Sequence, residues 1–600
     1  MKKRKILAGL LALAFVFGGA ALPAAVSSFD TAITASAEDS GDYRYRVFDD
    51  GTIRIERYFG SDTEITVPAE IDGKPVKCLG EYVFSGKSWI TSVTLSAGIE
   101  YIDNFAFYSC ENLKSVTIPD GVNCIKQGVF WDCPKLTDIT LPDTLETIDK
   151  TAFRKCTSLE NIAIPESVSR IGADAFADTI WLENRRSEDP QVIVNGILID
   201  GQKCTGDVVI PDGVTVINDN AFNSCSRITS VTIPDSVVSI GTDAFRGCST
   251  LKGITMPDSI TSMGENSFAF CVAMTNAKIS GSLEKIGKNA FWGCNNLTDV
   301  TIPEGVKIIG NSAFNSTGLV SITIPDGVTF IESDAFARCE ELTDITIPES
   351  VAEFGELVFD GTKWLENRQN EDPMVIVNGN LINGQKCEGD IVIPDGVTII
   401  NDRAFENCKT ITSVTIPEGV TNIDSRAFSY CENLAAVTLP NSLVNLEYQA
   451  FYTCTSLAEL TIPKNVKKIG NYVFSNCTSL KNATIYSSDA ELYPESLGYG
   501  EYLSKLEDFT ITGYDDSTAE EYAKKYGFEF ISMGSIPWSK GDLNHDGVVN
   551  VTDISLLAAH VKGMKKLEFA SEADLNGDGS INVTDISQLA AHVKGIKKLS

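Results

Sequence analysis

Residues 324–346 read Ile324-Pro-Asp-Gly-Val-Thr-Phe-Ile-Glu-Ser-Asp-Ala-Phe-Ala-Arg-Cys-Glu-Glu-Leu-Thr-Asp-Ile-Thr346, and Ile347 begins the same pattern again. The unit I-P-D-G-V-x-x-I-x-x-x-A-F-x-x-C-x-x-L-x-x-V-T returns every 23 residues between residues 95 and 485. A fixed period in this range is typical of a solenoid, in which no unit can bury its apolar positions without its neighbours. The Ile-Pro pair or a close variant begins at Ile118, Leu141, Ile164, Ile210, Ile233, Met256, Ile279, Ile302, Ile324, Ile347, Ile393, Ile416, Leu439 and Ile462.

Each unit contains its own geometry. The stretch Leu342-Thr-Asp-Ile-Thr-Ile347 alternates apolar and polar side chains, which predicts a strand. The copy in the next unit should lie beside it, about 4.8 Å away. The Pro-Asp-Gly segment predicts a turn, after which the Ala-Phe segment returns along the other side with its phenylalanine pointing inward.

This period, together with the A-F-x-x-C segment, resembles the leucine-rich repeats of the BspA-like family over most of the chain. The resemblance implies an α/β-type solenoid, a leucine-rich repeat ribbon of 23-residue units. A solenoid must also cover its terminal units, so we expect β-rich caps at both ends.

Twelve of the sixteen cysteines share one position, fifteen residues after the first residue of the unit. Stacked units would align them in a column of parallel side chains, which is a poor arrangement for disulfide pairing. We therefore expect reduced, buried cysteines that behave as small hydrophobes. Every histidine lies at residue 545 or later, so we expect no zinc site in the column. Its members are Cys110, Cys133, Cys156, Cys225, Cys248, Cys271, Cys294, Cys339, Cys408, Cys431, Cys454 and Cys477.

The period doubles twice to 46 residues, with inserts near 181–205 and 364–388. Both inserts begin Trp-Leu-Glu-Asn-Arg and later contain Val-Ile-Val-Asn-Gly, which predicts a hairpin with an asparagine in its turn. The inserts could be functional departures from a uniform ribbon. Duplication of one long block, with Ile164 and Ile347 at equivalent points of its two copies, would also explain their likeness and is the favoured interpretation.

The flanking segments divide the chain into expected domains. Residues 38–94 form a capping region with the first repeat, residues 95–485 the solenoid, and residues 486–532 a second cap. Ser517-Thr-Ala-Glu520 predicts the start of a short helix there, and residues 528–531 predict a strand. Residues 533–540 are a linker and residues 541–600 a separate module.

The first 37 residues have the features of a secretory leader. Lys2-Lys-Arg-Lys5 precedes an apolar run, and Ala35-Ser-Ala37 is a cleavage signature, so we expect a signal peptide at 1–37 and a secreted, extracellular protein. An uncleaved membrane anchor is the alternative. The net charge of −32 argues against nucleic acid and anionic membranes as partners, so we expect no nucleic acid and no membrane insertion.

One short passage near the end of the chain occurs twice, 32 residues apart. Oxygen donors stand at loop positions 1, 3, 5, 9 and 12 around a glycine at position 6, and position 7 would offer its backbone carbonyl. This spacing wraps a loop around Ca²⁺, so the sequence predicts two calcium ions. Their candidate ligands are Asp542, Asn544, Asp546, Val548, Asn550 and Asp553 in the first loop, and Asp574, Asn576, Asp578, Ser580, Asn582 and Asp585 in the second.

Each loop ends in aspartate instead of glutamate and leads into a helix pattern. Pro537 and Gly541 stand where an entering helix would be. Loop plus exiting helix, duplicated, resembles the type I dockerin module of cellulosomes, which implies a small α-helical calcium-binding module that docks onto the cohesin domain of a scaffoldin. A free calcium buffer or a stabilising tail is the alternative.

The resemblance also assigns partner contacts. Positions 10 and 11 of the loops touch the cohesin in that family, which here means Val551 and Thr552, and Val583 and Thr584. Many dockerins have a hydroxyl pair there, so the valines leave the identity of the cohesin open. The lysines that end both helices could suit the helix dipole or steer docking to an acidic partner.

Evidence for catalysis is weaker. The absence of histidine before residue 545 excludes histidine-dependent triads from the repeats. A carboxylate pair could still act as a glycosidase acid and base, but a ribbon of near-equivalent turns predicts no deep pocket. We therefore expect no catalytic residues and a leucine-rich repeat surface that binds an unknown protein or surface. A dockerin-borne polysaccharide- or protein-degrading enzyme and an inert spacer are the alternatives.

Overall fold

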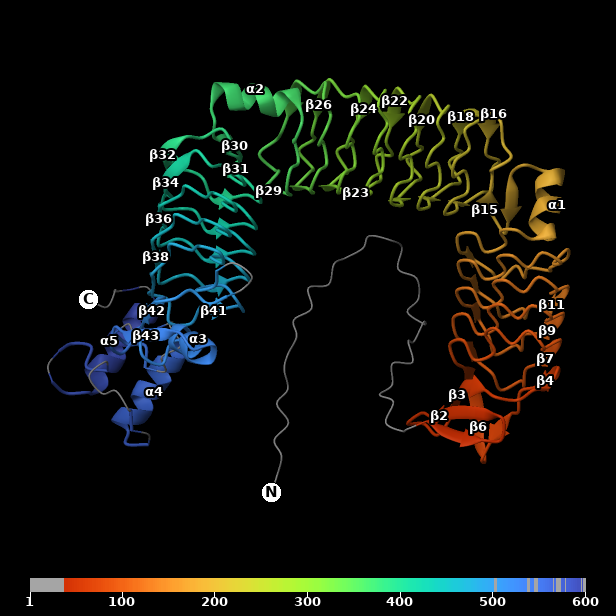
Figure 1. The fold of residues 1–600 in the computed structure, drawn as a ribbon, viewed down its shortest axis with the longest axis horizontal. Coiled ribbons are helices and arrows are strands. Elements are labelled where there is room, and N and C mark those ends of the chain that lie inside the picture. Colours follow the sequence, from red (N-terminus) through yellow and green to blue (C-terminus); the bar gives the residue numbers. More distant parts are fainter. Residues whose placement is uncertain are drawn as a thin grey trace. The chain divides into compact units, whose positions relative to one another are not determined.

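The computed structural model describes residues 37–500, 504–536, 540–543, 549–564, 566–567, 573–577, 579–594 and 596. The chain divides between Gly384 and Gln385 into two compact units, each considered by itself below. Figure 1 shows the turns of the solenoid stacked on one another, with the helices α1 and α2 leaving the stack at two points.

The first unit begins with a β-rich cap at the N-terminal end of the solenoid. β2 pairs antiparallel with β3, and β5 pairs antiparallel with β6, while β3 and β6 pair in parallel. Because β6 also pairs in parallel with β8 of the following turn, the cap continues the solenoid's sheet. The cap strands are β1 (Glu38–Ser40), β2 (Tyr43–Val47), β3 (Ile53–Tyr58), β4 (Glu64–Thr66), β5 (Glu70–Ile71) and β6 (Lys74–Leu79).

The predicted strand forms in most units and pairs in parallel and in register with its neighbours, in several separate sheets that together are called the first ladder here. Ser92 pairs with Ser115, and Ser115 pairs with Asp138, each partner standing at the same place one unit further along the chain. This first ladder comprises β7 (Ser92–Thr94), β9 (Ser115–Thr117), β11 (Asp138–Thr140), β16 (Gly206–Val209), β18 (Ile228–Thr232), β20 (Gly253–Thr255), β22 (Asn276–Lys278), β24 (Asp299–Thr301), β26 (Ser321–Thr323), β28 (Asp344–Thr346), β32 (Gly389–Val392), β34 (Ile411–Thr415), β36 (Ala436–Thr438), β38 (Glu459–Ile462) and β40 (Asn482–Ile485).

A second ladder of short strands, absent from the sequence prediction, forms at the V-x-x-I part of the unit. Its isoleucines are buried, as Ile125 and Ile148 show, and these two residues pair in parallel. Its strands are β8 (Tyr101–Ile102), β10 (Cys124–Ile125), β12 (Thr147–Ile148), β13 (Arg170–Ile171), β15 (Ile197–Asp200), β17 (Val216–Ile217), β19 (Ser239–Ile240), β21 (Ser262–Met263), β23 (Lys285–Ile286), β25 (Ile308–Ile309), β27 (Phe330–Ile331), β29 (Glu353–Phe354), β31 (Asn380–Asn383), β33 (Ile399–Ile400), β35 (Asn422–Ile423), β37 (Asn445–Leu446), β39 (Lys468–Ile469) and β41 (Glu491–Leu492).

The Ala-Phe segment of each unit is a run of turns joined by a third set of hydrogen bonds, here called the Ala-Phe ladder. Three alternate residues of one turn donate their backbone N–H groups to three carbonyls of the next turn. In the turn that contains Phe153, the N–H groups of Thr151, Phe153 and Lys155 donate to carbonyls of the following turn at 3.0, 2.7 and 2.9 Å. This ladder satisfies backbone groups that a strand or helix would otherwise pair.

The phenylalanines of the Ala-Phe segments point into the core, as predicted. They stack face to face from turn to turn; Phe107 and Phe130, for example, have ring centroids 5.3 Å apart at an interplanar angle of 9°. Each ring is fully buried. The repeated core therefore confirms the fold class: a leucine-rich repeat ribbon whose units bury their apolar positions against one another.

All sixteen cysteines are free in the structure, and all but Cys124 are buried. The column members also make a contact that the sequence did not suggest. The Cys133 thiol donates to the carbonyl of Phe107 at 3.1 Å, and Cys156 repeats this contact with Phe130 at 3.0 Å. One unit, which is a residue shorter than the others, carries Thr317 at this position. The cysteines thus act as small core residues that also satisfy a backbone carbonyl.

Burial predicts slow thiol chemistry. It raises the pKa of Cys110 and of Cys156 from the ordinary 9.0 to about 12. The pKa of the folded thiol lies above that of the unfolded thiol. These groups therefore leave the free energy of unfolding unchanged below about pH 9 and lower it as the pH rises further. We expect Ellman's reagent at pH 8 to react slowly with the native protein and with all sixteen thiols after denaturation.

A bridge between neighbouring column cysteines, found by mass spectrometry of non-reduced protein, would contradict this prediction. Replacing Cys133 by alanine should destabilise the protein by about 1 kcal/mol, the scale of a small core truncation. The same substitution at the half-buried Cys124 is the control, and it should have a smaller effect.

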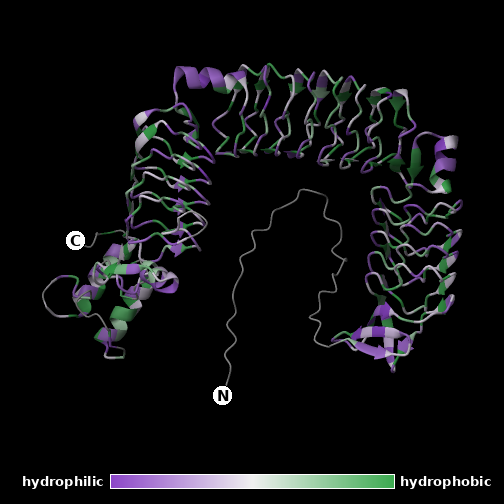
Figure 2. Ribbon diagram, in the orientation of Figure 1, coloured by the Kyte–Doolittle hydropathy of each residue, from purple (hydrophilic) through white to green (hydrophobic). Residues whose placement is uncertain are grey.

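Each insert begins with a helix that ends one stack of phenylalanines. α1 (Ile180–Glu188) is capped by the Thr179 side chain, which accepts a hydrogen bond from Leu182 N. Trp181 then packs on Phe176, with centroids 4.6 Å apart. α2 (Lys363–Glu371) repeats this arrangement, with a Thr cap and a Trp–Phe distance of 4.7 Å. Both helices are otherwise largely hydrophilic (Figure 2).

The predicted hairpins follow the helices. β14 (Val192–Val194) pairs antiparallel with β15, and β30 (Val375–Val377) pairs antiparallel with β31. The turn residue Asn195 lies in the left-handed region at φ 49°, as predicted for an asparagine in this turn. Its side-chain amide donates to the carbonyls of Pro165 and Val168, at 2.7 and 2.9 Å, which ties the hairpin to the preceding turn.

The two inserts differ in one matched pair of side chains. In the first, Arg186 makes a two-pronged ion pair with Asp200, at 2.8 and 2.6 Å. Hydrogen bonding to Asp200 raises the pKa of Arg186. In the second, Gln369 donates to Asn383 at 2.6 Å instead. An ion pair and a neutral amide pair thus occupy equivalent places.

This exchange predicts strong coupling in a double-mutant cycle. Arg186→Gln or Asp200→Asn alone leaves a charge at a site where the two side chains are only 13% and 9% exposed, and either should cost about 3–5 kcal/mol. The double variant recreates the pair of the second insert and should cost about 1 kcal/mol or less. Urea unfolding followed by tryptophan fluorescence measures both effects, and additive costs would contradict the prediction.

The second unit ends as the sequence suggested. α3 (Thr518–Tyr526) is capped by Ser517 at its start and by left-handed Gly527 at its end. β42 (Thr510–Gly513) pairs in parallel with β40 and with β43 (Glu529–Ser532), so the first ladder continues into the cap. Beyond the cap, two further helices, α4 (Val551–Val561) and α5 (Val583–Val593), pack together.

Candidate docking module and solenoid surfaces

The two predicted calcium loops precede α4 and α5. In the first, the structure describes Asp542, Leu543 and residues 549–553, so Asn544, Asp546 and Val548 lie outside the described residues. In the second, only Asp578 lies outside them.

The last acid of each loop holds the loop closed. Asp585 accepts hydrogen bonds from Leu575 N at 2.8 Å, Asn576 N at 3.2 Å and Asn582 N at 2.9 Å, so it joins loop positions 2, 3 and 9. Asp553 does the same in the first loop, where it accepts from Leu543 N and Asn550 N, each at 2.8 Å. These contacts bring the two ends of each loop together.

The first acid of the second loop turns the chain inside it. Asp574 accepts from Gly577 N and Gly579 N, each at 2.8 Å. Both glycines lie in the left-handed region, at φ 72° and 83°, which other residues adopt rarely. The Ser580 carbonyl accepts from the Asn582 side chain at 3.2 Å. Hydrogen bonds thus connect candidate ligands of this loop to one another or to the backbone between Leu575 and Asn582.

The donor set fits a hard cation. Asp542, Asp553 and Asp585 are fully buried, and burying ionised carboxylates is costly unless a partner or a metal compensates their charge. Asp546, Asp574 and Asp578 add further carboxylates. The remaining donors are amide and carbonyl oxygens, which Ca²⁺ accepts and softer metals do not prefer. Among the described side chains, no three histidine, cysteine or acidic groups gather as a metal cluster.

The loop acids also start the helices. Asn550 and Asn582 are the N-caps of α4 and α5, and each accepts a hydrogen bond from the backbone two residues on. Asp553 and Asp585 complete a capping box by accepting from the N-cap backbone. The same carboxylate therefore closes a loop and begins a helix, which couples the two elements.

The module's core follows the duplication. Leu543 and Leu575, and Leu557 and Leu589, are buried pairs that stand at equivalent places in the two halves. They pack together with Leu567 and Ala573. The two halves thus contribute equivalent residues to one core, and equivalent surfaces face outward.

The predicted partner residues lie on those surfaces. Val551 and Val583 are 65% and 66% exposed at the first turn of their helices, and Thr552 and Thr584 are exposed beside them. The sequence prediction missed a second matched pair: Met564 and Ile596, after the helices, are exposed as well. Apolar residues at the same place in both halves were the signal that could have identified them.

The basic residues at the helix ends are only partly described. Lys562 and Lys594 are the C-caps of α4 and α5 and are exposed, so they lie where the negative end of a helix dipole favours a cation. Lys565, Lys597 and Lys598 lie outside the described residues.

A cluster of half-buried and exposed aromatic residues lies on the Ala-Phe side of the solenoid. The rings of Tyr108 and Trp131, which share one repeat position, lie edge to face with centroids 5.5 Å apart. Phe105 and Tyr82 extend this cluster, and Arg154 lies over Trp131. These rings cover one another or are covered by Arg154, so the cluster offers ring edges more than open faces.

Comparisons with known proteins agree with this architecture. A family model for the BspA type leucine-rich repeat region matches residues 77–192, 202–317, 271–388 and 383–499. A model for the dockerin type I domain matches residues 540–594. No curated protein matches the chain. No helix among the described residues is long and apolar enough to cross a membrane.

Several solved structures are similar in sequence at a low level. A leucine-rich cell surface protein from Faecalibacterium prausnitzii is 22% identical over 82% of this chain and 97% of its own, with a TM-score of 0.27. Leucine-rich repeat proteins from Bacteroides ovatus and Eubacterium ventriosum are 20% and 21% identical, over 83% and 55% of this chain and 99% and 96% of their own, with TM-scores of 0.23 and 0.35.

The family models cover the stacked turns and the duplicated loops separately. The repeat model follows the turns that stack Phe on Phe, and the dockerin model follows the two loops with their exiting helices. The chain therefore belongs to the BspA-type leucine-rich repeat family and carries a type I dockerin domain.

Proposed function

We propose that this chain is an exported, non-catalytic component of a cellulosome-type assembly for polysaccharide degradation. It docks onto the cohesin domain of a scaffoldin through its dockerin and presents the leucine-rich repeat solenoid to a protein or surface ligand. The observation that carries this proposal is the duplicated module, with Val551 and Val583 equally exposed on its two halves.

The docking surface depends on two calcium ions in this proposal. Asp542, Asn544, Asp546, Asn550 and Asp553 hold one ion with the Val548 carbonyl. Asp574, Asn576, Asp578, Asn582 and Asp585 hold the other with the Ser580 carbonyl. Because Asp553 and Asp585 also cap α4 and α5, ion binding positions the helices that bear Val551 and Val583.

Export follows from the leader. Residues 1–37 are removed as a signal peptide, residues 38–532 form the capped solenoid, and residues 541–600 form the dockerin after a linker at 533–540. The leader itself lies almost wholly outside the described residues. The mature protein is then extracellular and attached to a scaffold.

A pull-down tests the solenoid's role. The full mature chain, held on an immobilised cohesin, is exposed to the secretions and growth substrate of its source. Retention of a specific protein or surface supports the proposal. A turnover screen on polysaccharides and proteins separates it from an enzyme component, because activity that survives repurification would overturn the non-catalytic assignment. Retention of nothing at all would favour a spacer.

A further inference from the structure

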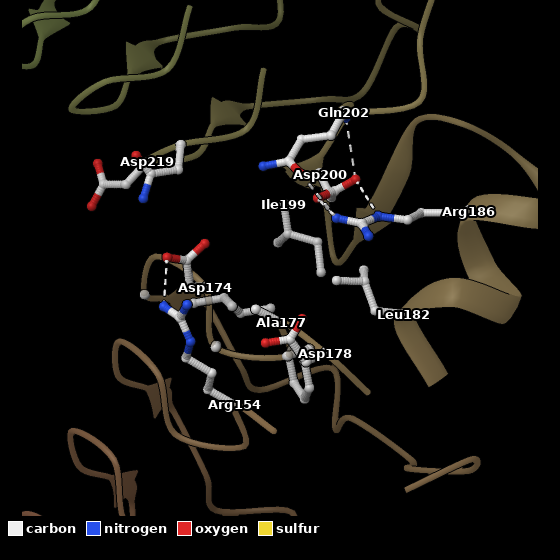
Figure 3. A pocket seen from close by; sticks show the side chains of 15 residues that line it. Arg154, Asp174, Ala177, Asp178, Leu182, Arg186, Ile199, Asp200, Gln202 and Asp219 are labelled. Atoms are coloured by element: carbon white, nitrogen blue, oxygen red, sulfur yellow. Dashed lines mark hydrogen bonds and ion pairs between the residues drawn. The ribbon is translucent and has the colours of Figure 1, made fainter. Parts of the chain in front are cut away.

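A hollow interrupts the solenoid at the first insert. Its volume is about 250 Å³, and its lining comes from the turn at 171–178, from the following turn at Asp219 and Asn220, and from Ile199, Asp200 and Gln202 between them. Arg154, Leu182 and Arg186 complete the lining. Figure 3 shows Asp219 on one side of the hollow and Asp174 on the other. It lies wholly within the first unit.

The hollow exists because one Ala-Phe segment is missing. The insert supplies β15 to the second ladder, but the chain turns at Gly201 directly after it. Gly201 N donates to the Ala221 carbonyl at 2.7 Å, which replaces only one of the three hydrogen bonds of a regular rung. A side chain at residue 201 would clash with the Phe222 ring, so the turn is close-packed on its inner side.

The missing segment leaves backbone groups of the Ala-Phe ladder without partners. The N–H groups of Asp174, Phe176 and Asp178 occupy the three donor positions of their turn, and none has an acceptor among the described residues. The carbonyl of Asp219, which also lines the hollow, occupies an acceptor position of the next complete turn, and no described group donates to it. We call these four groups the open rung.

The charges around the hollow are unbalanced. Arg186 is held by Asp200 and Glu183, and Arg154 pairs with Asp174. No described cation forms an ion pair with Asp178 or Asp219, although Asp219 accepts a hydrogen bond from Thr242 N at 2.7 Å. The site is therefore suited to a ligand that brings a positive charge.

We propose that the hollow binds a short extended peptide segment that contains lysine or arginine. The peptide backbone completes the open rung: its carbonyls accept from the N–H groups of Asp174, Phe176 and Asp178, and one of its N–H groups donates to the carbonyl of Asp219. Its cationic side chain lies against Asp178 and Asp219. This is the turn-ladder counterpart of strand addition at a sheet edge, where main-chain hydrogen bonds supply affinity and side chains supply specificity.

The size and chemistry of the hollow favour this occupant. A cavity of about 250 Å³ admits a short stretch of extended chain and no folded domain. An anion would meet the carboxylates of Asp178 and Asp219, and an apolar ligand would leave the open rung unpaired, which is costly for desolvated backbone groups. The inference rests on the ligand-binding half of the proposed function and is independent of the dockerin.

Hydrogen–deuterium exchange of the full chain provides the first test. Without ligand, the segment 173–178 should exchange faster than 150–155, the equivalent segment one turn earlier. The peptide Ac-Ala-Lys-Ala-Lys-Ala-NH2 at millimolar concentration should slow 173–178 selectively, and Ac-Ala-Glu-Ala-Glu-Ala-NH2 should not. Equal protection of both segments without peptide, or no effect of the lysine peptide, would overturn the proposal.

A filling variant provides the second test. Ala177→Tyr places a ring into the hollow at a repeat position where other turns carry Tyr108, Trp131 or Trp292, so the fold should tolerate it. Peptide affinity should fall at least tenfold, whereas Asn315→Tyr, which introduces the same ring at the same repeat position of an uninterrupted turn, should leave it unchanged. Cohesin binding by the same variants should be unchanged. Measuring it separately shows whether the docking proposal fails independently of the peptide proposal. Equal affinity of both variants would show that the peptide binds elsewhere.

Discussion

Removal of calcium with EDTA should abolish binding of the full chain to an immobilised cohesin and leave the solenoid folded. Asp542, Asp553 and Asp585 are fully buried, and without a cation the loop carboxylates repel one another. The energy of ion binding is then also folding energy for the module. Hydrogen exchange of α4 and α5 should rise sharply, while circular dichroism of the chain should change little.

The control for this experiment is the choice of metal. Added Ca²⁺ should restore docking, and Mg²⁺ at the same concentration should restore it poorly, because the smaller ion requires near-octahedral geometry and gives up its water reluctantly. Equal docking in EDTA and in calcium would contradict the role proposed for the loops. It would leave the family assignment of the repeats untouched.

Loss of both exposed valine surfaces should eliminate cohesin binding, whereas loss of either alone should hardly change it. Because the two halves present equivalent surfaces, we expect the module to dock in two orientations related by a half-turn. Val551→Asp with Thr552→Asp removes one of two equivalent modes, a loss of RT ln 2, or about 0.4 kcal/mol. Val583→Asp with Thr584→Asp should have the same small effect, and all four substitutions together should abolish binding in calorimetric titration.

These variants should remain folded. Both valines are about two-thirds exposed, and aspartate in the first turn of a helix is favoured by the helix dipole. The matched control places charges on the solenoid instead, with Thr301→Asp and Thr323→Asp on exposed strand positions. If one double variant alone eliminated binding, a single half would carry the contact and the symmetry would have no role in docking.

The fold could be predicted from the sequence because every repeat gives independent evidence for the same strand, turn and core positions. Leu342, Ile345 and Phe336 recur at fixed intervals, so an error in one unit is corrected by the others. The second ladder was missed because two residues, such as Thr147 and Ile148, are too few to show an alternating pattern. Their pairing follows only from the register of the first ladder.

The helices of the inserts could not be predicted because their cause is not local. In α1 the buried residues, Trp181 and Leu182, are adjacent, so no helical apolar period is visible. The helix forms where Phe176 ends a stack of rings and needs a cover, and Thr179 provides a cap. The thiol contact of Cys133 with Phe107 is hidden for the same reason, since its partner is 26 residues away.

The calcium loops were easier to predict from the sequence than the surface of the solenoid. The spacing of Asp574, Asn582 and Asp585 is dictated by the ion they are proposed to hold, so it is visible in the sequence. The hollow beside Asp178 arises from a segment that is absent. It became visible only when the ladder of hydrogen bonds on both sides was known.

The two inserts have a consequence for how such a protein changes over time. Asn195 and Asn378 anchor their hairpins to the preceding turn in the same way. The stretch of chain between the two inserts therefore has matching contacts at its two ends. Recombination between the two copies would therefore add or delete the whole block that separates Ile164 from Ile347, without exposing core. At about 4.8 Å per turn, the reach of the ribbon could evolve in steps of several turns at a time, while both caps and the dockerin stay unchanged.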